Sequence, residues 1–123
     1  MDRTLTAIRH RFDRLGLLLS CLCALHCVAG VVIVLGLGFG SSLLLDPIIH
    51  EVGLVLATVV AAVAIGLGAL RHRRAAPFVT AMTGLSFMGG ALAVPHGVDE
   101  AVLTVIGVTL VAAGHLLNLR RAL

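Results

Sequence analysis

The sequence contains no tryptophan, no tyrosine and no lysine, and only 12% of its 123 residues are charged. A typical soluble domain is about a quarter charged, so a chain this poor in charge could not keep its apolar surface in water. The shortage therefore excludes a soluble enzyme, a disordered tail and a fibrous protein. The missing tyrosine and tryptophan also remove the aromatic belt that usually marks membrane interfaces.

Catalytic motifs are missing as well. The sequence has no P-loop, no Gly-x-Ser-x-Gly elbow and no His-Glu-x-x-His pair, because His50-Glu51 is followed by Leu54 where the second histidine would stand. It has three cysteines but no Cys-x-x-Cys redox pair. We therefore predict that the protein is not an enzyme.

Apolar residues are what the chain does have, at 59% of the total with a mean hydropathy of +1.12. Because a membrane span needs roughly 20 residues, four spans account for most of the length. We place them at about 15–39, 51–70, 77–94 and 101–119. The short loops favour an all-α, antiparallel four-helix transmembrane bundle, forming a single domain over residues 1–123.

The basic residues lie in three clusters, at the N-terminus, between the second and third spans, and at the C-terminus. All nine are arginine: Arg3, Arg9, Arg11, Arg14, Arg71, Arg73, Arg74, Arg120 and Arg121. The bias of basic residues sets membrane topology, so we expect both termini in the cytoplasm. Long apolar stretches separate the clusters, so there is no continuous basic surface with aromatic residues interleaved, which excludes a nucleic-acid surface.

Each expected span carries one face of small or polar residues at helical spacing, which is typical of helix contacts in lipid. From the first span to the fourth these faces are Gly16, Ser20, Cys23, Cys27 and Gly30; His50, Gly53, Ala57, Ala61, Ala64, Gly68 and His72; Pro77, Thr80, Gly84, Met88 and Ala91; and Thr104, Gly107, Val111, His115 and Asn118. Cys21 falls on the opposite side of the first span. We expect these faces to point into the bundle.

Cys23, His26 and Cys27 form the main candidate site. Cys23 and Cys27 are one helical turn apart, with His26 beside them near the middle of the expected span. Thiolates and imidazole suit a soft metal ion, and an ionisable residue inside a membrane is costly and usually functional. Packing is the alternative, since a buried cysteine often behaves as a small apolar residue. Zinc would need four ligands, which one helix cannot easily supply.

His115, in the fourth span, is the second candidate metal ligand. The alternative for His115 is a hydrogen bond that closes the bundle, with Asn118 one turn further along. His50 and His96 fall at the outer ends near Glu51, Asp99 and Glu100. They could line an acidic mouth for cations, or simply face solvent. His72, among arginines, fits an interfacial anchor.

This pattern resembles the MerC mercuric-transport family of small four-span bacterial membrane proteins. The residues that carry the resemblance are Asp13-Arg14-Leu15-Gly16, Cys23-Ala-Leu-His26-Cys27, His50-Glu51, His72-Arg73 and Gly107 through His115-Leu-Leu-Asn118. The second, cytoplasmic cysteine pair of well-known mercury transporters is absent. An inner transfer step would then fall to His115, Cys21 or the thiols of a partner.

The resemblance implies uptake of Hg(II) across the bacterial inner membrane by thiol and imidazole ligand exchange. Cys23 and Cys27 would bind the metal and His26 would assist. The expected partners are a periplasmic metal-binding protein, a cytoplasmic reductase and possible further copies of the chain. No cofactor is expected to be permanently bound, because the metal ion is the substrate. A different soft metal, or a metal-binding or structural oligomer without transport, remains the alternative.

Overall fold

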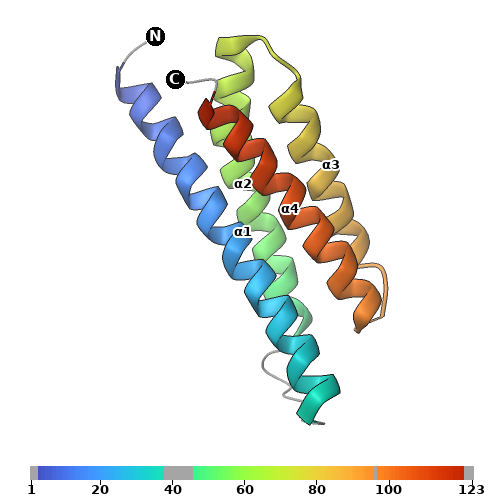
Figure 1. Cartoon of the computed structure of the whole chain (residues 1–123). Helices are drawn as coiled ribbons and strands as arrows, with labels where there is room; N and C mark the ends of the chain where they lie inside the picture. The colour runs from blue at the N-terminus through green and yellow to red at the C-terminus, as the bar shows by residue number, and fades with distance from the viewer. Residues whose placement is uncertain (1–2, 38–45, 96, 121–123) are drawn as a thin grey trace.

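The structure is a computed structural model that describes residues 3–37, 46–95 and 97–120. Four helices make up the described chain: α1 (Arg3–Leu37), α2 (Pro47–His72), α3 (Ala76–Ala91) and α4 (Val98–Arg120). They run alternately down and up, so that the first turn of α1 and the last turn of α4 lie at the same end of the bundle (Figure 1). The prediction of an all-helical fold is confirmed.

Three of the helices are long and apolar enough to cross a membrane, over Arg3–Ile33, Ile48–Arg71 and Val98–Arg120. The third helix, α3, has only 16 residues, which is about 24 Å of helix and shorter than the roughly 20 residues of a typical span. The prediction that residues 77–94 form a fourth span therefore stays a prediction.

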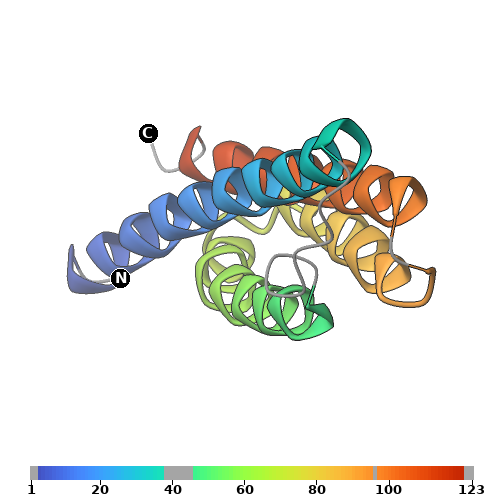
Figure 2. The same cartoon turned by 90° about the horizontal axis from the view of Figure 1, so that it is seen from below.

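Neighbouring helices in the bundle are α1 with α2, α2 with α3, α3 with α4, and α4 with α1, as the view from below shows (Figure 2). The closest approach is between α3 and α4. A Cβ atom on Gly84 would lie 2.6 Å from the carbonyl oxygen of Gly107, and one on Gly107 would lie 2.7 Å from that of Gly84. Glycine at both positions lets the two backbones touch, as small residues do between membrane helices.

The small-residue faces point into the bundle as expected. Ala57, Ala61 and Ala64 of α2 are at most 6% exposed, and Gly84 and Met88 of α3 are buried against α4. Large apolar side chains instead cover the outside, among them Leu18, Leu25, Val55, Leu70 and Val79. An apolar exterior around an interior of small residues is the pattern of a helix bundle in lipid.

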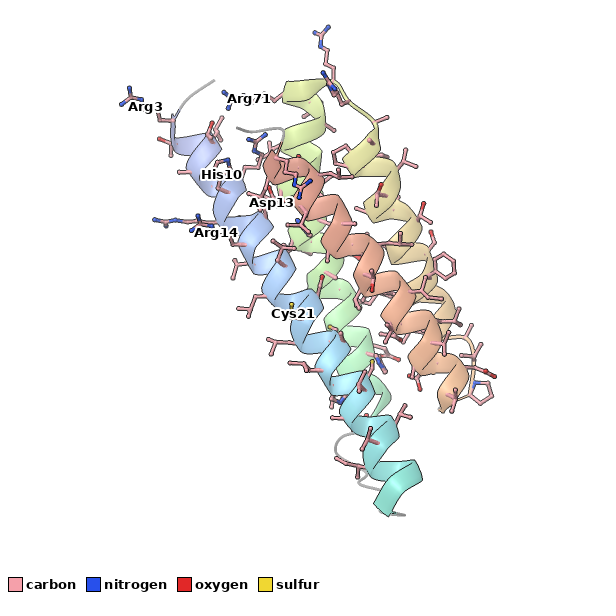
Figure 3. The ribbon with its side chains drawn as sticks, in the orientation of Figure 1. Arg3, His10, Asp13, Arg14, Cys21 and Arg71 are labelled. Carbon is pink, nitrogen blue, oxygen red and sulfur yellow. The ribbon has the colours of Figure 1, made fainter. Side chains whose placement is uncertain are left out.

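At the arginine-rich end of the bundle, a side-chain contact joins α1 and α2. Arg71, at the end of α2, donates a hydrogen bond to the hydroxyl of Thr6 in the first turns of α1. Arg3 and Arg14 extend away from the bundle on the outer side of α1 (Figure 3). This end therefore gathers arginines from separate parts of the sequence, as the charge pattern predicts.

Candidate metal centre

Three potential metal-binding side chains meet where α1 faces the first turn of α2. His26 and Cys27 come from α1 and His50 from α2, and one donor atom of each lies within 4.8 Å of the other two. Cys27 is only 6% exposed, while His26 and His50 are half-buried. We call these three residues the outer cluster.

His50 is held from both sides of its ring. Its Nδ1 lies 2.7 Å from Oε1 of Glu100 in α4, and its Nε2 lies 3.3 Å from Sγ of Cys27. A carboxylate only accepts hydrogen bonds, so Nδ1 is the donor to Glu100, and in the neutral imidazole Nε2 then has the lone pair that faces the thiol. The ring of His26 stands edge-on to that of His50, with 5.9 Å between centroids.

The start of α2 places His50 at this position. Asp46 caps the helix by accepting a hydrogen bond from the backbone N–H of Ile48, and proline follows it in the first turn. Both features are typical of helix N-termini. His50 therefore falls in the first turn of α2, level with Glu100 in the first turn of α4. The outer cluster consequently lies near the N-terminal ends of α2 and α4, at the end of the bundle opposite the arginines. The expected position of His26 near the middle of a membrane span stays a prediction.

A cavity of about 540 Å³ opens beside the outer cluster, between α1 and α2. Cys23, His26 and His50 line it together with apolar side chains, and Met88 and Thr104 reach it from the other two helices. Cys23 is half-buried and its Sγ lies against Gly53 of α2, where an added Cβ would be 3.7 Å away. One thiol and two imidazoles thus face the same space.

A second histidine is paired with a carboxylate towards the arginine-rich end. The Nδ1 of His115 lies 2.7 Å from Oδ1 of Asp13, and the side-chain amide of Asn118 donates to Oδ2 of Asp13 at 2.8 Å. The same amide donates to the backbone carbonyl of Ala64 at 2.9 Å. These bonds join α1, α2 and α4, and we call Asp13, His115 and Asn118 the inner cluster.

The inner cluster is closed to solvent, because Asp13, His115 and Asn118 are each 0% exposed. Glycine makes room for it: a Cβ on Gly16 would overlap the imidazole of His115, and one on Gly68 would overlap the amide of Asn118. Among the residues that the structure describes, none is a hydrogen-bond partner of the Nε2 of His115. The buried Arg9, one turn before Asp13, interacts electrostatically with that carboxylate and offsets its charge.

The structure brings together Cys23, His26 and Cys27 of the sequence-predicted site, but it does not bring His115 to them. Gly16, which contacts His115, and Cys27 are about 16 Å apart along α1. From the sequence, His50 and Glu100 were expected at an outer mouth. The contact of His50 with Cys27 was not predicted, and neither was the pairing of Asp13 with His115. Extending the buried face of the first helix by one step from Gly16 would have reached Asp13.

Three further residues were considered from the sequence. Cys21 is on the exposed surface of α1 (Figure 3), as expected from its helical position. His72 is the last residue of α2. His96 lies outside the described residues.

Comparison with known proteins gives one family match. Residues 13–120 match the model of the family described as MerC mercury resistance protein. No curated protein and no solved structure matches the chain. The matched region includes both clusters and nearly the whole described chain.

Proposed function

The chain belongs to the MerC family of mercury resistance proteins, and from that premise we propose that it carries Hg(II), or another soft metal ion, across a bacterial inner membrane. Family membership and the three long apolar helices suggest mercury-related transport in a membrane rather than catalysis. The finer statements, namely the ion, the membrane and the ligand-exchange route, are our proposal.

The observation that supports the proposal is the cavity beside the outer cluster. It gives access to the thiol of Cys23 and the imidazoles of His26 and His50 from one opening between α1 and α2. Cys27 lies one helical turn from Cys23 and contacts His50. Thiolate sulfur is the ligand that soft metal ions prefer, and two thiols one turn apart on a helix can share a single ion.

Transport in this scheme proceeds by exchange of sulfur ligands. An incoming Hg(II) bound by two thiolates gives up one metal–sulfur bond as a new bond forms to the sulfur of Cys23 or Cys27. The proton of the cysteine thiol goes to the released thiolate, so charge and atoms balance. A second exchange would leave the ion between Cys23 and Cys27, with His26 as the auxiliary ligand.

His115 is the candidate ligand on the way to the other face of the membrane, through its Nε2. Its contacts set a condition on that role. Nδ1 is engaged by Asp13 and Nε2 packs against Gly16, so the ion could reach Nε2 only after α1 and α4 separate at this level. With α1 and α4 packed together, His115 holds the bundle closed.

The proposed setting follows from the charge pattern and from the family. The arginine-rich end would face the cytoplasm, with both termini there, and α3 would be the fourth span. A periplasmic metal-binding protein would deliver the ion to the outer cluster, and a cytoplasmic reductase would receive it. Further copies of the chain could enclose the pathway, because large apolar side chains cover the outside of the bundle.

The test is mercury uptake by cells that express single cysteine variants at equal levels. Cys23→Ser and Cys27→Ser are expected to abolish the uptake that the wild-type chain adds, and the mercury bound by purified protein should fall with it. Cys21→Ser is the matched control, since Cys21 is exposed on the same helix away from the cavity. Uptake at the wild-type level by all three variants would contradict the proposal. Mercury binding by the wild-type chain without uptake would favour a metal-binding protein that does not transport.

A further inference from the structure

The outer cluster offers a donor set different from the two cysteines. Two imidazoles and one thiol converge there, and they come from two helices rather than one. Hg(II) is satisfied by two thiolates, whereas nitrogen-rich sets with one sulfur suit divalent ions of borderline softness such as Zn(II). We infer that His26, Cys27 and His50 form a second metal site, which binds a borderline divalent cation of the Zn(II) class.

Distances within the cluster fit such an ion. Tetrahedral zinc with ordinary bond lengths places a nitrogen and a sulfur ligand about 3.6 Å apart. The separation of His50 Nε2 and Cys27 Sγ is 3.3 Å, so these two atoms could hold the ion with little movement. The three donor atoms lie within 4.8 Å of one another, and a contraction of about 1 Å would complete the set.

Glu100 acts as a positioning residue for this site. Metal-binding histidines usually donate their second ring N–H to a carboxylate, which fixes the tautomer and the direction of the lone pair. His50 does so towards Glu100 at 2.7 Å, and its Nε2 faces Cys27. The side chain of Glu100 is only 7% exposed, so little solvent competes for this contact.

The fourth coordination position would face the cavity. His26 and His50 both line that space, which has room for water or an exchanging ligand. Three protein ligands with one open position are typical of zinc sites that exchange a ligand, whereas structural zinc sites are closed by four. An ion bound here could therefore enter and leave from the cavity.

The inference shares Cys27 with the proposed mercury pair but does not depend on transport. His26 also belongs to both sets, as the auxiliary ligand for mercury, so the two sets differ at Cys23 for mercury and at His50 for the borderline ion. Replacing Cys23 should remove only the mercury pair, and replacing His50 should remove only the second site. Failure of one proposal is therefore distinguishable from failure of the other.

The experiment is a titration of the purified full-length chain in detergent with Co(II), followed by displacement with Zn(II). Wild-type protein should bind one Co(II) per chain, with a near-ultraviolet sulfur-to-cobalt absorption band that one equivalent of Zn(II) removes. Cys27→Ser should lose the band, and His26→Ala and His50→Ala should weaken binding at least tenfold. Cys23→Ser should bind as the wild type does, and so should His10→Ala, a histidine control at the other end of α1.

Glu100 is tested by two substitutions in the same titration. Glu100→Ala should weaken Co(II) binding roughly 10–100-fold, as loss of a carboxylate behind a ligand histidine does. Glu100→Gln, whose amide oxygen can still accept from Nδ1, should restore most of the affinity. A helical circular dichroism spectrum equal to that of the wild type in detergent shows that each histidine and Glu100 variant is folded.

Three results would overturn the inference. They are absence of Co(II) and Zn(II) binding by the wild type, unchanged binding by His50→Ala, and loss of the band in Cys23→Ser as complete as in Cys27→Ser. The last result would assign any bound ion to the two cysteines alone.

Discussion

One histidine of the outer cluster and one of the inner cluster each pair with a carboxylate, but the surroundings of the two pairs differ. In both, Nδ1 of a histidine lies 2.7 Å from a carboxylate oxygen, of Glu100 for His50 and of Asp13 for His115. The difference is at the far side of the ring, where Nε2 of His50 faces a thiol and a cavity, whereas Nε2 of His115 faces Gly16. The group that lies against Nε2 therefore decides the role of each histidine. His50 is a potential metal ligand, whereas His115 makes a packing contact.

Burial separates the clusters as well. The side chains of Asp13 and His115 are 0% exposed, whereas that of His50 is 20% exposed. A buried hydrogen-bonded pair leaves an unsatisfied group behind when one member is removed, which is costly. A pair beside a cavity can be resolvated. We therefore expect the inner cluster to contribute mainly to stability and the outer cluster mainly to binding.

The largest effect should come from removing the carboxylate of the inner cluster. Asp13→Ala leaves Nδ1 of His115 without its partner and Arg9 without its compensating charge, and it should cost about 3–5 kcal/mol, as breaking a buried pair does. Glu100→Ala is the matched change beside the outer cluster and should cost less, about 1–3 kcal/mol, because the side chain of His50 is 20% exposed and its freed Nδ1 can be hydrated. Thermal unfolding in detergent, followed by circular dichroism, measures both. Equal losses would show that the two clusters do not differ in the way described.

A smaller effect is expected from filling the glycines that face each cluster. Gly16→Ala would push a methyl group into the imidazole of His115, and such overpacking should cost about 1–3 kcal/mol. Gly53→Ala would place its methyl 3.7 Å from Sγ of Cys23, an ordinary contact, and could gain up to about 1 kcal/mol from helix propensity. The same unfolding measurement compares them. A destabilising Gly53→Ala would mean that the outer cluster is packed as tightly as the inner one.

The smallest effect concerns the cysteines and should leave stability unchanged. Hg(II) added before a maleimide should slow alkylation of Cys23 and Cys27 several-fold, because both sulfurs would be engaged by one ion. Cys21 should react at the same rate with and without the metal, since it is exposed away from the cavity. Mass spectrometry of the labelled peptides follows all three thiols. Protection of Cys21 alone would place the mercury site on the outside of α1.

The repeat of small residues was enough to predict which faces of the helices are buried. Packing in lipid selects such residues wherever two backbones approach, so Ala57, Ala61 and Gly84 could be assigned to the interior from spacing alone. The same spacing placed Cys27 inside and Cys21 outside. These assignments need only the periodicity of a single helix, and the sequence alone is enough to apply that periodicity.

Pairings between helices could not be derived in this way. His50 contacts Cys27, which lies 23 positions away along the chain. The contact depends on how α1 and α2 are aligned along their axes, and the residue pattern of a single helix does not contain that alignment. Asp13 was assigned to a basic segment before the first span, whereas α1 continues without a break through it. Helical spacing can place Asp13 on the buried face, but its pairing with His115 is recognisable only when the position of α4 is known.

One continuous α1 carries a residue of the inner cluster and two of the outer cluster. It runs 35 residues, or about 52 Å, and Asp13 and Cys27 lie about 21 Å apart along it. Asp13 joins the helix to α4, so a tilt of α1 about this point would act over the length of helix that separates the two clusters. A rocking of about 5° around this point would move Cys27 sideways by ~2 Å. That displacement is comparable to a metal–ligand bond, so a small tilt of one rigid helix is sufficient to assemble the outer donor atoms or to part them.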